Sequence, residues 1–140
     1  MYLILTTLLH LGSILPLIRY DSRPIRLYCI IIVFSTHFSI LYHFYEESHP
    51  IITMIDYLFA FIWFLSDLSL AYLYPFQQLM IKVVTGNSIV FIINLLIPHN
   101  SMYVIYHSIW HIINSYKCFY ISSCIHKNQA GIGTQAMGLF

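Results

Sequence analysis

Five polar side chains in apolar stretches of this chain have types and spacings that suit metal-dependent hydrolysis. Ser39 and His43 are four residues apart, Asp56 follows them, and His107 and His111 are again four residues apart. Positions i and i+4 share one face of a helix, so the last two histidines can present two imidazoles to one ion. His43 completes a set of three zinc ligands that leaves the fourth position for water.

The acid and the hydroxyl in this set suit the two remaining tasks of a hydrolase. A carboxylate that does not bind the metal can orient the bound water and accept its proton, so we expect Asp56 to be a general base. Ser39 can hydrogen-bond a substrate carbonyl or the oxyanion that develops from it. The set therefore predicts hydrolysis of an amide or an ester by a metal-activated water.

Less specialised roles exist for the same residue types. A histidine inside a membrane is often only hydrogen-bonded across a helix interface, and a serine often bonds the carbonyl one turn back. A structural zinc would use the same three histidines without catalysis. Haem bound by histidines on facing helices is a third interpretation, and it leaves Ser39 and Asp56 without a role.

Other polar residues have weaker patterns. Asp67 lies eleven residues beyond Asp56, about three turns along nearly the same helix face, where it can pair with Asn94 or another polar group. Asn114, one turn beyond His111, is expected to hold helices together or to support a metal ligand. The three cysteines have no CxxC spacing and are expected to be free thiols. The remaining histidines are expected to be structural or solvated: His10, His37, His49, His99 and His126.

The composition is that of a membrane protein. Of 140 residues, 59% are hydrophobic and only 8% are charged, whereas soluble domains have about 25% charged residues. The mean hydropathy is +0.77. A formal net charge of +1 provides no basic surface for nucleic acid, and this class of partner is excluded.

The apolar stretches predict an all-α polytopic transmembrane bundle of about five spans. Each span needs about 20 residues, and the chain has room for five with short loops. The fourth is the weakest, because Lys82, Gly86 and Asn87 interrupt its start, and without it four spans remain. Residues 1–125 form one transmembrane domain, and 126–140 are expected to be a flexible cytosolic tail. The predicted spans are 2–18, 25–45, 51–74, 79–97 and 102–124.

The charges predict the orientation, because cations collect in cytoplasmic loops. With five spans all six cations lie at or near one face: Arg19, Arg23, Arg26, Lys82, Lys117 and Lys127. Glu46 and Glu47 fall on the other side. This places the N-terminus outside or in a lumen, the C-terminus in the cytosol, and the five site residues at one depth near the lumenal face. A four-span chain would put the last two histidines at the wrong end.

The ordered set SxxxH, Asp, HxxxH resembles the CREST superfamily of membrane hydrolases, which includes alkaline ceramidases, GPI-anchor lipid-remodelling proteins and the progestin and adipoQ receptors. The segment His107-Ser-Ile-Trp-His111 is similar to the HxxWH of ceramidases and remodellers, and Asp56-Tyr57 with Ala60 looks like the remodellers' DYxxA. The resemblance covers roughly residues 30–75 and 100–115. Family members generally have seven spans, and the missing length falls between Tyr74 and Ser101.

By this resemblance, His43, His107 and His111 would bind zinc, and Asp56 and Ser39 would assist catalysis. The substrate would be a membrane lipid with an amide or ester bond, ceramide-like or GPI-like, in an endoplasmic reticulum or Golgi type of membrane. A non-catalytic scaffold or lipid-binding relative with a structural zinc is the alternative, and a GPI-lipid-remodelling esterase is a second one. The missing spans also allow a cavity assembled as a homo-oligomer.

Overall fold

The computed structural model describes residues 2–20, 22–45, 48–73, 77–97 and 101–137. Over these residues the chain folds into five α-helices and one short 3-10 helix, with no strand. The predicted all-α bundle is therefore confirmed. The elements are α1 (Tyr2–Gly12), η1 (Leu15–Leu17), α2 (Arg23–Phe44), α3 (Pro50–Leu73), α4 (Gln77–Leu96) and α5 (Ser101–Met137).

Proline residues mark several of the helix boundaries. Pro24 occupies the first turn of α2, after Ser22 in an extended conformation (φ −105°, ψ 144°), and Pro50 is the first residue of α3. A proline is tolerated in the first helical turn, where its missing N–H has no intrahelical partner. Pro16 lies in η1, which separates α1 from α2.

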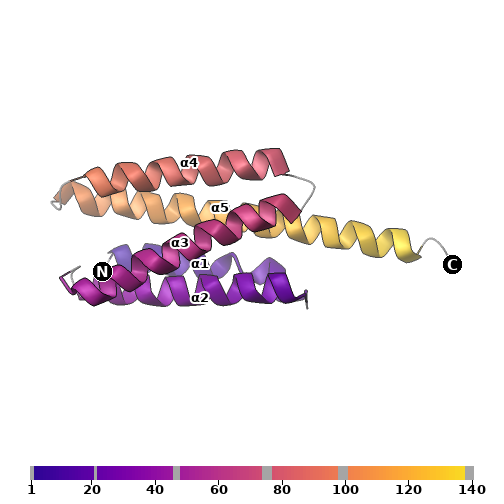
Figure 1. Ribbon diagram of the computed structural model, residues 1–140, viewed down its shortest axis with the longest axis horizontal. Helices are drawn as coiled ribbons and strands as arrows, with labels where there is room; N and C mark the ends of the chain where they lie inside the picture. Colours follow the sequence, from indigo (N-terminus) through magenta and orange to yellow (C-terminus); the bar gives the residue numbers. More distant parts are fainter. Residues whose placement is uncertain (1, 21, 46–47, 74–76, 98–100, 138–140) are drawn as a thin grey trace.

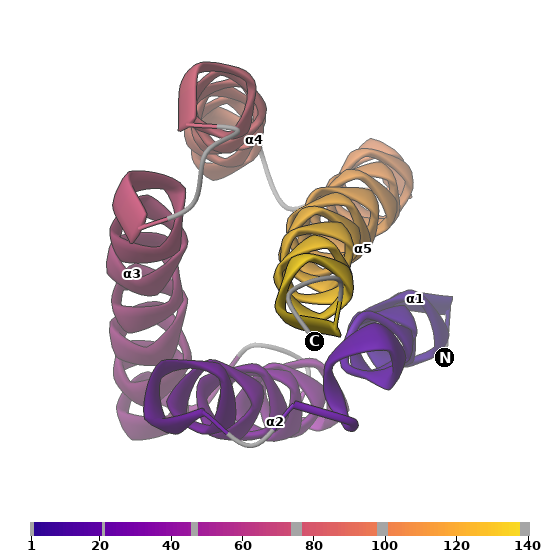
Figure 2. The same ribbon diagram turned by 90° about the vertical axis from the view of Figure 1, so that its right-hand side faces the viewer.

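The five helices run back and forth along the long axis and form a closed ring. Each helix packs against the next one in the chain, and α5 packs against α1 and so closes the ring. The end-on view shows the order α1, α2, α3, α4, α5 around the bundle (Figure 2). The two termini lie at opposite ends (Figure 1). Consequently the end of α2 and the starts of α3 and α5 lie at the same end of the molecule.

Among the residues that the structure describes, three helices are long and apolar enough to cross a membrane: Arg23–Phe44, Pro50–Leu73 and Gln78–Leu96. The segment Leu3–Leu17 is a shorter apolar helix. Large apolar side chains such as Leu65, Ile92 and Phe119 are exposed on the outside of the bundle. Polar side chains are instead buried between the helices. This distribution is that of an integral membrane protein, whose outer surface contacts lipid.

Helix α5 is longer than the fifth predicted span. It continues to Met137, well beyond the expected end at residue 124, and its C-terminal part projects from the bundle (Figure 1). The backbone is therefore helical through most of 126–140, the segment predicted as a tail.

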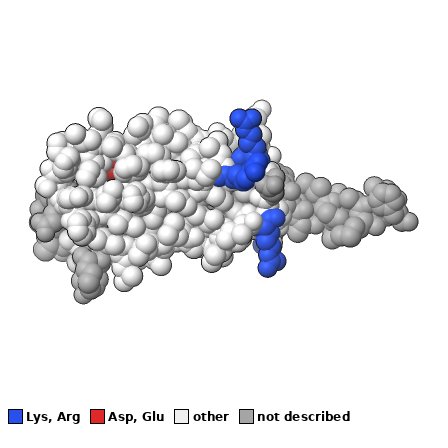
Figure 3. All heavy atoms as spheres, turned by 90° about the horizontal axis from the view of Figure 1, so that it is seen from below, with Lys and Arg blue, Asp and Glu red and all other residues white. Residues whose placement is uncertain are grey.

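The cations are concentrated at one end of the bundle. On the face shown in Figure 3, Lys and Arg side chains form a band beside the projecting part of the chain. The exposed cations among the described residues come from the end of η1, the starts of α2 and α4, and the last part of α5: Arg19, Arg23, Arg26, Lys82 and Lys127. These segments meet at one end because the helices alternate in direction.

The interior has a hydrophobic core toward one end, which also encloses the ion pair of Asp67 and Lys117, and a polar half toward the other end. The hydrophobic core lies near the cation end, where the start of α2, the end of α3, the start of α4 and the middle of α5 meet; it includes Ile25, Ile32, Leu70, Val84 and Ile121. The buried histidines and Asp56 lie in the other half. Packing at the cation end therefore holds the bundle together while the opposite half accommodates polar groups.

Candidate metal centre

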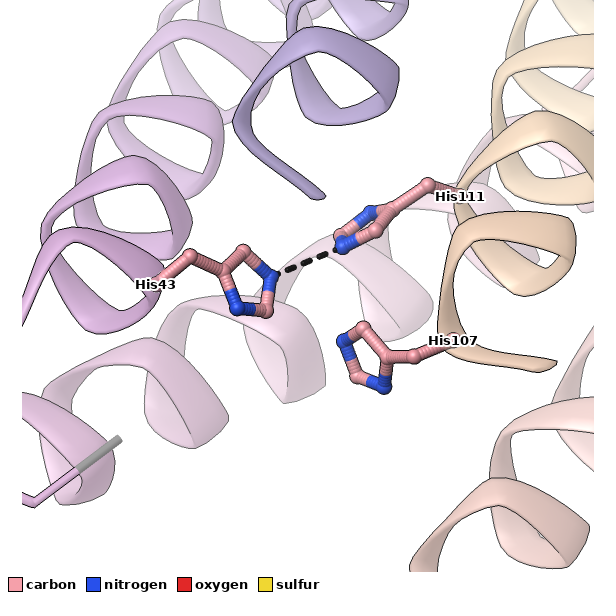
Figure 4. Close-up of side chains that lie close together, drawn as sticks. All are labelled: His43, His107 and His111. Carbon is pink, nitrogen blue, oxygen red and sulfur yellow. Dashed lines mark hydrogen bonds between the residues drawn. The ribbon is translucent and has the colours of Figure 1, made fainter. Parts of the chain in front are cut away.

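Three histidines meet inside the polar half of the bundle. One nitrogen from each of His43, His107 and His111 can be chosen so that all lie within 4.8 Å of one another, and all three side chains are buried. Figure 4 shows the three rings turned toward a common point, one from α2 and two from α5. These are the three residues that the sequence predicts to converge.

Helix direction and side-chain spacing together produce this cluster. His43 is in the last turn of α2, and His107 and His111 are in the second and third turns of α5. Because α2 ends and α5 begins at the same end of the bundle, the three residues have the same depth. The spacing of four on α5 places both imidazoles on one helix face.

The distances suit a shared metal ion. The Nε2 atoms of His43 and His111 are 2.9 Å apart, near the separation of about 3.3 Å between two nitrogens at 2.0 to 2.1 Å from a tetrahedral ion. The His107 ring centre lies 5.0 Å from that of His43 and 4.8 Å from that of His111. Three buried imidazoles of this arrangement could hold a metal ion and leave a further coordination position.

Helix α1 supplies a hydroxyl that contacts one ligand of the cluster. Thr7 Oγ1 lies 3.2 Å from His111 Nε2 and donates a hydrogen bond to the Leu3 carbonyl at 2.8 Å. Since its proton is directed to Leu3, its lone pairs face His111 Nε2, the same nitrogen that lies 2.9 Å from His43 Nε2. The Thr7 hydroxyl oxygen therefore lies beside the position that a shared ion would take. Thr7 has no distinctive spacing to any histidine, so the sequence did not indicate it.

A second group from α1 supports the backbone of the same ligand. His10 Nε2 lies 3.3 Å from the His111 carbonyl oxygen and 3.2 Å from Asn114 Nδ2. Asn87 in turn donates a hydrogen bond to Asn114 Oδ1 at 3.1 Å. His10 thus has a structural role, which is one of the two roles, structural or solvated, that the sequence predicted for it. Asn114 joins α1, α4 and α5, and it contacts His10 rather than the ring of His111.

A cavity of about 400 Å³ adjoins the cluster at His107, whereas His43 and His111 are not part of its wall. Its wall contains His107 together with both residues predicted to assist catalysis, Ser39 and Asp56, and all three are buried in the bundle. The volume lies in the range of small-molecule sites, about 300 to 1,000 Å³. Much of the remaining wall is apolar and includes Phe61, Phe64, Phe91, Ile92 and Leu95.

Asp67 pairs with another polar group inside the bundle, as one of the two expectations for it stated, and this group is Lys117 and not Asn94. Lys117 Nζ donates to Asp67 Oδ2, and Tyr28 Oη donates to Asp67 Oδ1 at 2.7 Å. Lys117 was predicted to lie near the cytosolic face with the other cations. It is in fact buried, 4% exposed, because its position on α5 turns it toward Asp67.

The remaining predicted residues are placed as follows. Cys29, Cys118 and Cys124 are free thiols, as expected. His37 and His49 are exposed, which agrees with a solvated or structural role. His99 lies outside the described residues.

Comparisons of the chain with protein-family models, with curated proteins and with solved structures found no match.

Proposed function

We propose that this chain is a zinc-dependent intramembrane lipid hydrolase of ceramidase-like type, which cleaves an amide or ester bond with a metal-activated water. The observation that carries the proposal is the shared cavity: His107, Asp56 and Ser39 lie in the wall of one largely apolar space. The order of the same residues in the sequence, which resembles that of the CREST superfamily, agrees with it.

Each residue has a defined task in this reaction. His43, His107 and His111 hold the zinc, which when bound lowers the pKa of a water toward 7 and polarises the substrate carbonyl. Asp56 accepts the proton of the attacking water and returns it to the leaving amine or alcohol. Ser39 hydrogen-bonds the carbonyl oxygen and stabilises the negative charge that develops there.

The surroundings favour a lipid as the substrate. A helix bundle with an apolar outer surface presents its cavity to molecules that dissolve in the bilayer, and the Phe and Ile side chains of the wall suit an acyl chain. A ceramide-like amide is the first candidate and a GPI-like ester the second. By the positive-inside rule, the end of the bundle with the exposed cations lies in the cytosol. The histidine site then lies nearer the opposite face of the membrane, which in an endomembrane is the lumenal face.

A structural zinc is the competing role, because an ion held by His43 and His107 would also tie α2 to α5. Two measurements separate the roles. Elemental mass spectrometry of detergent-purified wild type should find about one zinc per chain, and His107→Ala should lose it. His37→Ala, which changes an exposed histidine of α2, should retain it.

Turnover of a ceramide and of an ester-linked lipid is then measured for wild type and for Asp56→Asn. Product formation that disappears in Asp56→Asn while zinc is retained supports the hydrolase. Zinc without any product would assign the centre a structural role, and wild type without metal would contradict both. An intense Soret band in the visible spectrum would indicate haem instead.

A further inference from the structure

The buried pair of Lys117 and Asp67 has no task in the proposed hydrolysis. It joins α5 to α3, and Tyr28 on α2 donates to the same carboxylate. Moving two charges out of water is costly, and apolar side chains of similar volume often stabilise a protein as well or better. Ionisable residues inside a membrane protein therefore mark functional sites by default.

The pair lies against the same cavity as the metal centre. Lys117, Asp67 and Trp63 all contribute to its wall, and Lys117 Nζ lies 4.9 Å from the centre of the Trp63 ring. The Lys117 side chain is 5% exposed and that of Asp67 is 0% exposed. Since Lys117 carries N–H donors and is the less buried of the two, it is the member of the pair that can donate a hydrogen bond to a ligand in the cavity.

The charges define which chemical group fits there. An ammonium group has three N–H donors, and Asp67 Oδ2 accepts one of them. Asp67 already balances the positive charge, so a carboxylate or phosphate would bring an uncompensated negative charge into a low-dielectric site. A neutral oxygen that accepts a hydrogen bond, such as a hydroxyl, has no such cost.

The position of Lys117 defines where this oxygen lies in the ligand. Lys117 follows His107 by ten residues on α5, which is a rise of about 15 Å along the helix. Phe64 and Phe91 are among the apolar residues of the same wall. An extended chain advances by about 1.2 Å per bond, so an oxygen on the twelfth carbon of an acyl chain lies about 13 Å from the carbonyl.

We propose that Lys117, held by Asp67, is a second binding subsite of the cavity, which hydrogen-bonds a hydroxyl midway along the acyl chain of a lipid amide or ester. The placement of the lipid carbonyl beside His107 rests on the proposed function. Lys117 itself takes no part in the hydrolysis. It selects lipids with a mid-chain oxygen over lipids with a plain chain.

Binding of matched lipids tests this subsite without relying on turnover. Detergent-purified protein with the substitution Asp56→Asn, which should keep zinc without hydrolysing the lipids, is the background of every titration. It is titrated with the ethanolamides of stearic, 12-hydroxystearic and 6-hydroxystearic acid, and mass spectrometry verifies that each amide stays intact. The chain contains two tryptophans, Trp63 and Trp110, and both lie in the cavity wall. Their fluorescence reports occupancy directly.

We expect the 12-hydroxy amide to bind about tenfold more tightly than the plain amide, as a hydrogen bond to a charged group allows, and the 6-hydroxy amide to show no such gain. The double variant Lys117→Met/Asp67→Asn removes both charges together, so it leaves no unpaired charge, and it should bind the two amides equally. Lys117→Arg should keep part of the preference.

Equal affinities in the protein that keeps Lys117 and Asp67, a preference that survives in the double variant, or no binding of any of the amides would each overturn the subsite. Turnover distinguishes this result from the proposed function. A protein that prefers the 12-hydroxy amide but hydrolyses no lipid would retain the subsite and lose the hydrolase.

Discussion

The Nε2 atoms of His43 and His111 lie 2.9 Å apart although the residues are 68 positions apart in the chain. Two ring nitrogens at this distance either share a proton or bind a common ion. His107 lies beside both rings (Figure 4), and a third imidazole favours the ion.

Removal of the metal should destabilise the protein. A ligand that binds only the folded state adds about 2.7 kcal/mol at a concentration one hundred times its Kd. We therefore expect a chelator to lower the melting temperature of wild type and added zinc to restore it, as measured by circular dichroism in detergent. His111→Ala should show no response to the chelator, whereas His37→Ala should respond like wild type. An unchanged melting temperature of chelated wild type, verified as metal-free, would contradict a bound ion.

Asp56→Asn should reduce lipid hydrolysis by about 10² to 10⁴-fold, because an amide cannot accept the proton of the attacking water. The side chain keeps its size, and zinc content measured in parallel should not change. Ser48→Ala, a change at an exposed position outside the cavity, is the matched control and should keep full activity. Loss of zinc together with activity would reassign Asp56 to metal binding.

Thr7→Val should weaken zinc binding by about 2 to 10-fold, the net effect of about one hydrogen bond, because it removes a hydroxyl oxygen beside the Nε2 atom that faces the ion. The substitution replaces the hydroxyl beside His111 with a methyl group of similar size. Zinc affinity is measured by competition with a chromogenic chelator. Thr6→Val is the control, since the Thr6 hydroxyl donates to the same Leu3 carbonyl at 3.0 Å. Equal losses of zinc affinity in both variants would show that the effect comes from a change in helix α1 and not from the Thr7 hydroxyl.

Lys117→Met should destabilise the bundle by roughly 3 to 5 kcal/mol, because it leaves the Asp67 carboxylate buried without its cation. The double variant Lys117→Met/Asp67→Asn should recover most of this loss, since no charge remains. Thermal unfolding of the three proteins gives the comparison, with Lys82→Met as an exposed control. A double variant as unstable as the single one would mean that the pair stabilises through packing instead of charge.

The orientation of the bundle can be read by labelling engineered cysteines. In a background without the native thiols, Lys127→Cys should react with an impermeant maleimide only from the cytosolic side, and Ser48→Cys only from the opposite side. Both positions are exposed in the structure. The expectation follows from the positive-inside rule. Labelling of both cysteines from one side would rule out an odd number of spans between them.

The sequence predicted the helices and the depth of the site because both depend on local quantities. Hydropathy over about 20 residues identifies segments that cross a bilayer, and helices that alternate in direction bring the end of α2 and the start of α5 together. The spacing of four between His107 and His111 is enough to place two imidazoles on one face. These arguments use chain length, direction and periodicity only.

Lys117 shows where a local argument fails. It was grouped with the surface cations, although it follows Asn114 by three residues and so continues the spacing of His107, His111 and Asn114 along α5. This spacing was the feature of the sequence that could have indicated a buried Lys117. Whether it does so depends on which face of α5 is turned toward the interior of the bundle, and a count of charges does not contain this information.

What the sequence by itself determined is therefore the all-α membrane bundle and the convergence of His43, His107 and His111. Only the tertiary structure decided that α5 closes against α1, which brings Thr7 and His10 to the histidines, and that Lys117 pairs with Asp67. The physical reason is that helices in lipid are apolar on most faces, so hydropathy does not define their rotation about their own axes. Packing between neighbouring helices defines it, and that depends on residues far apart in the chain.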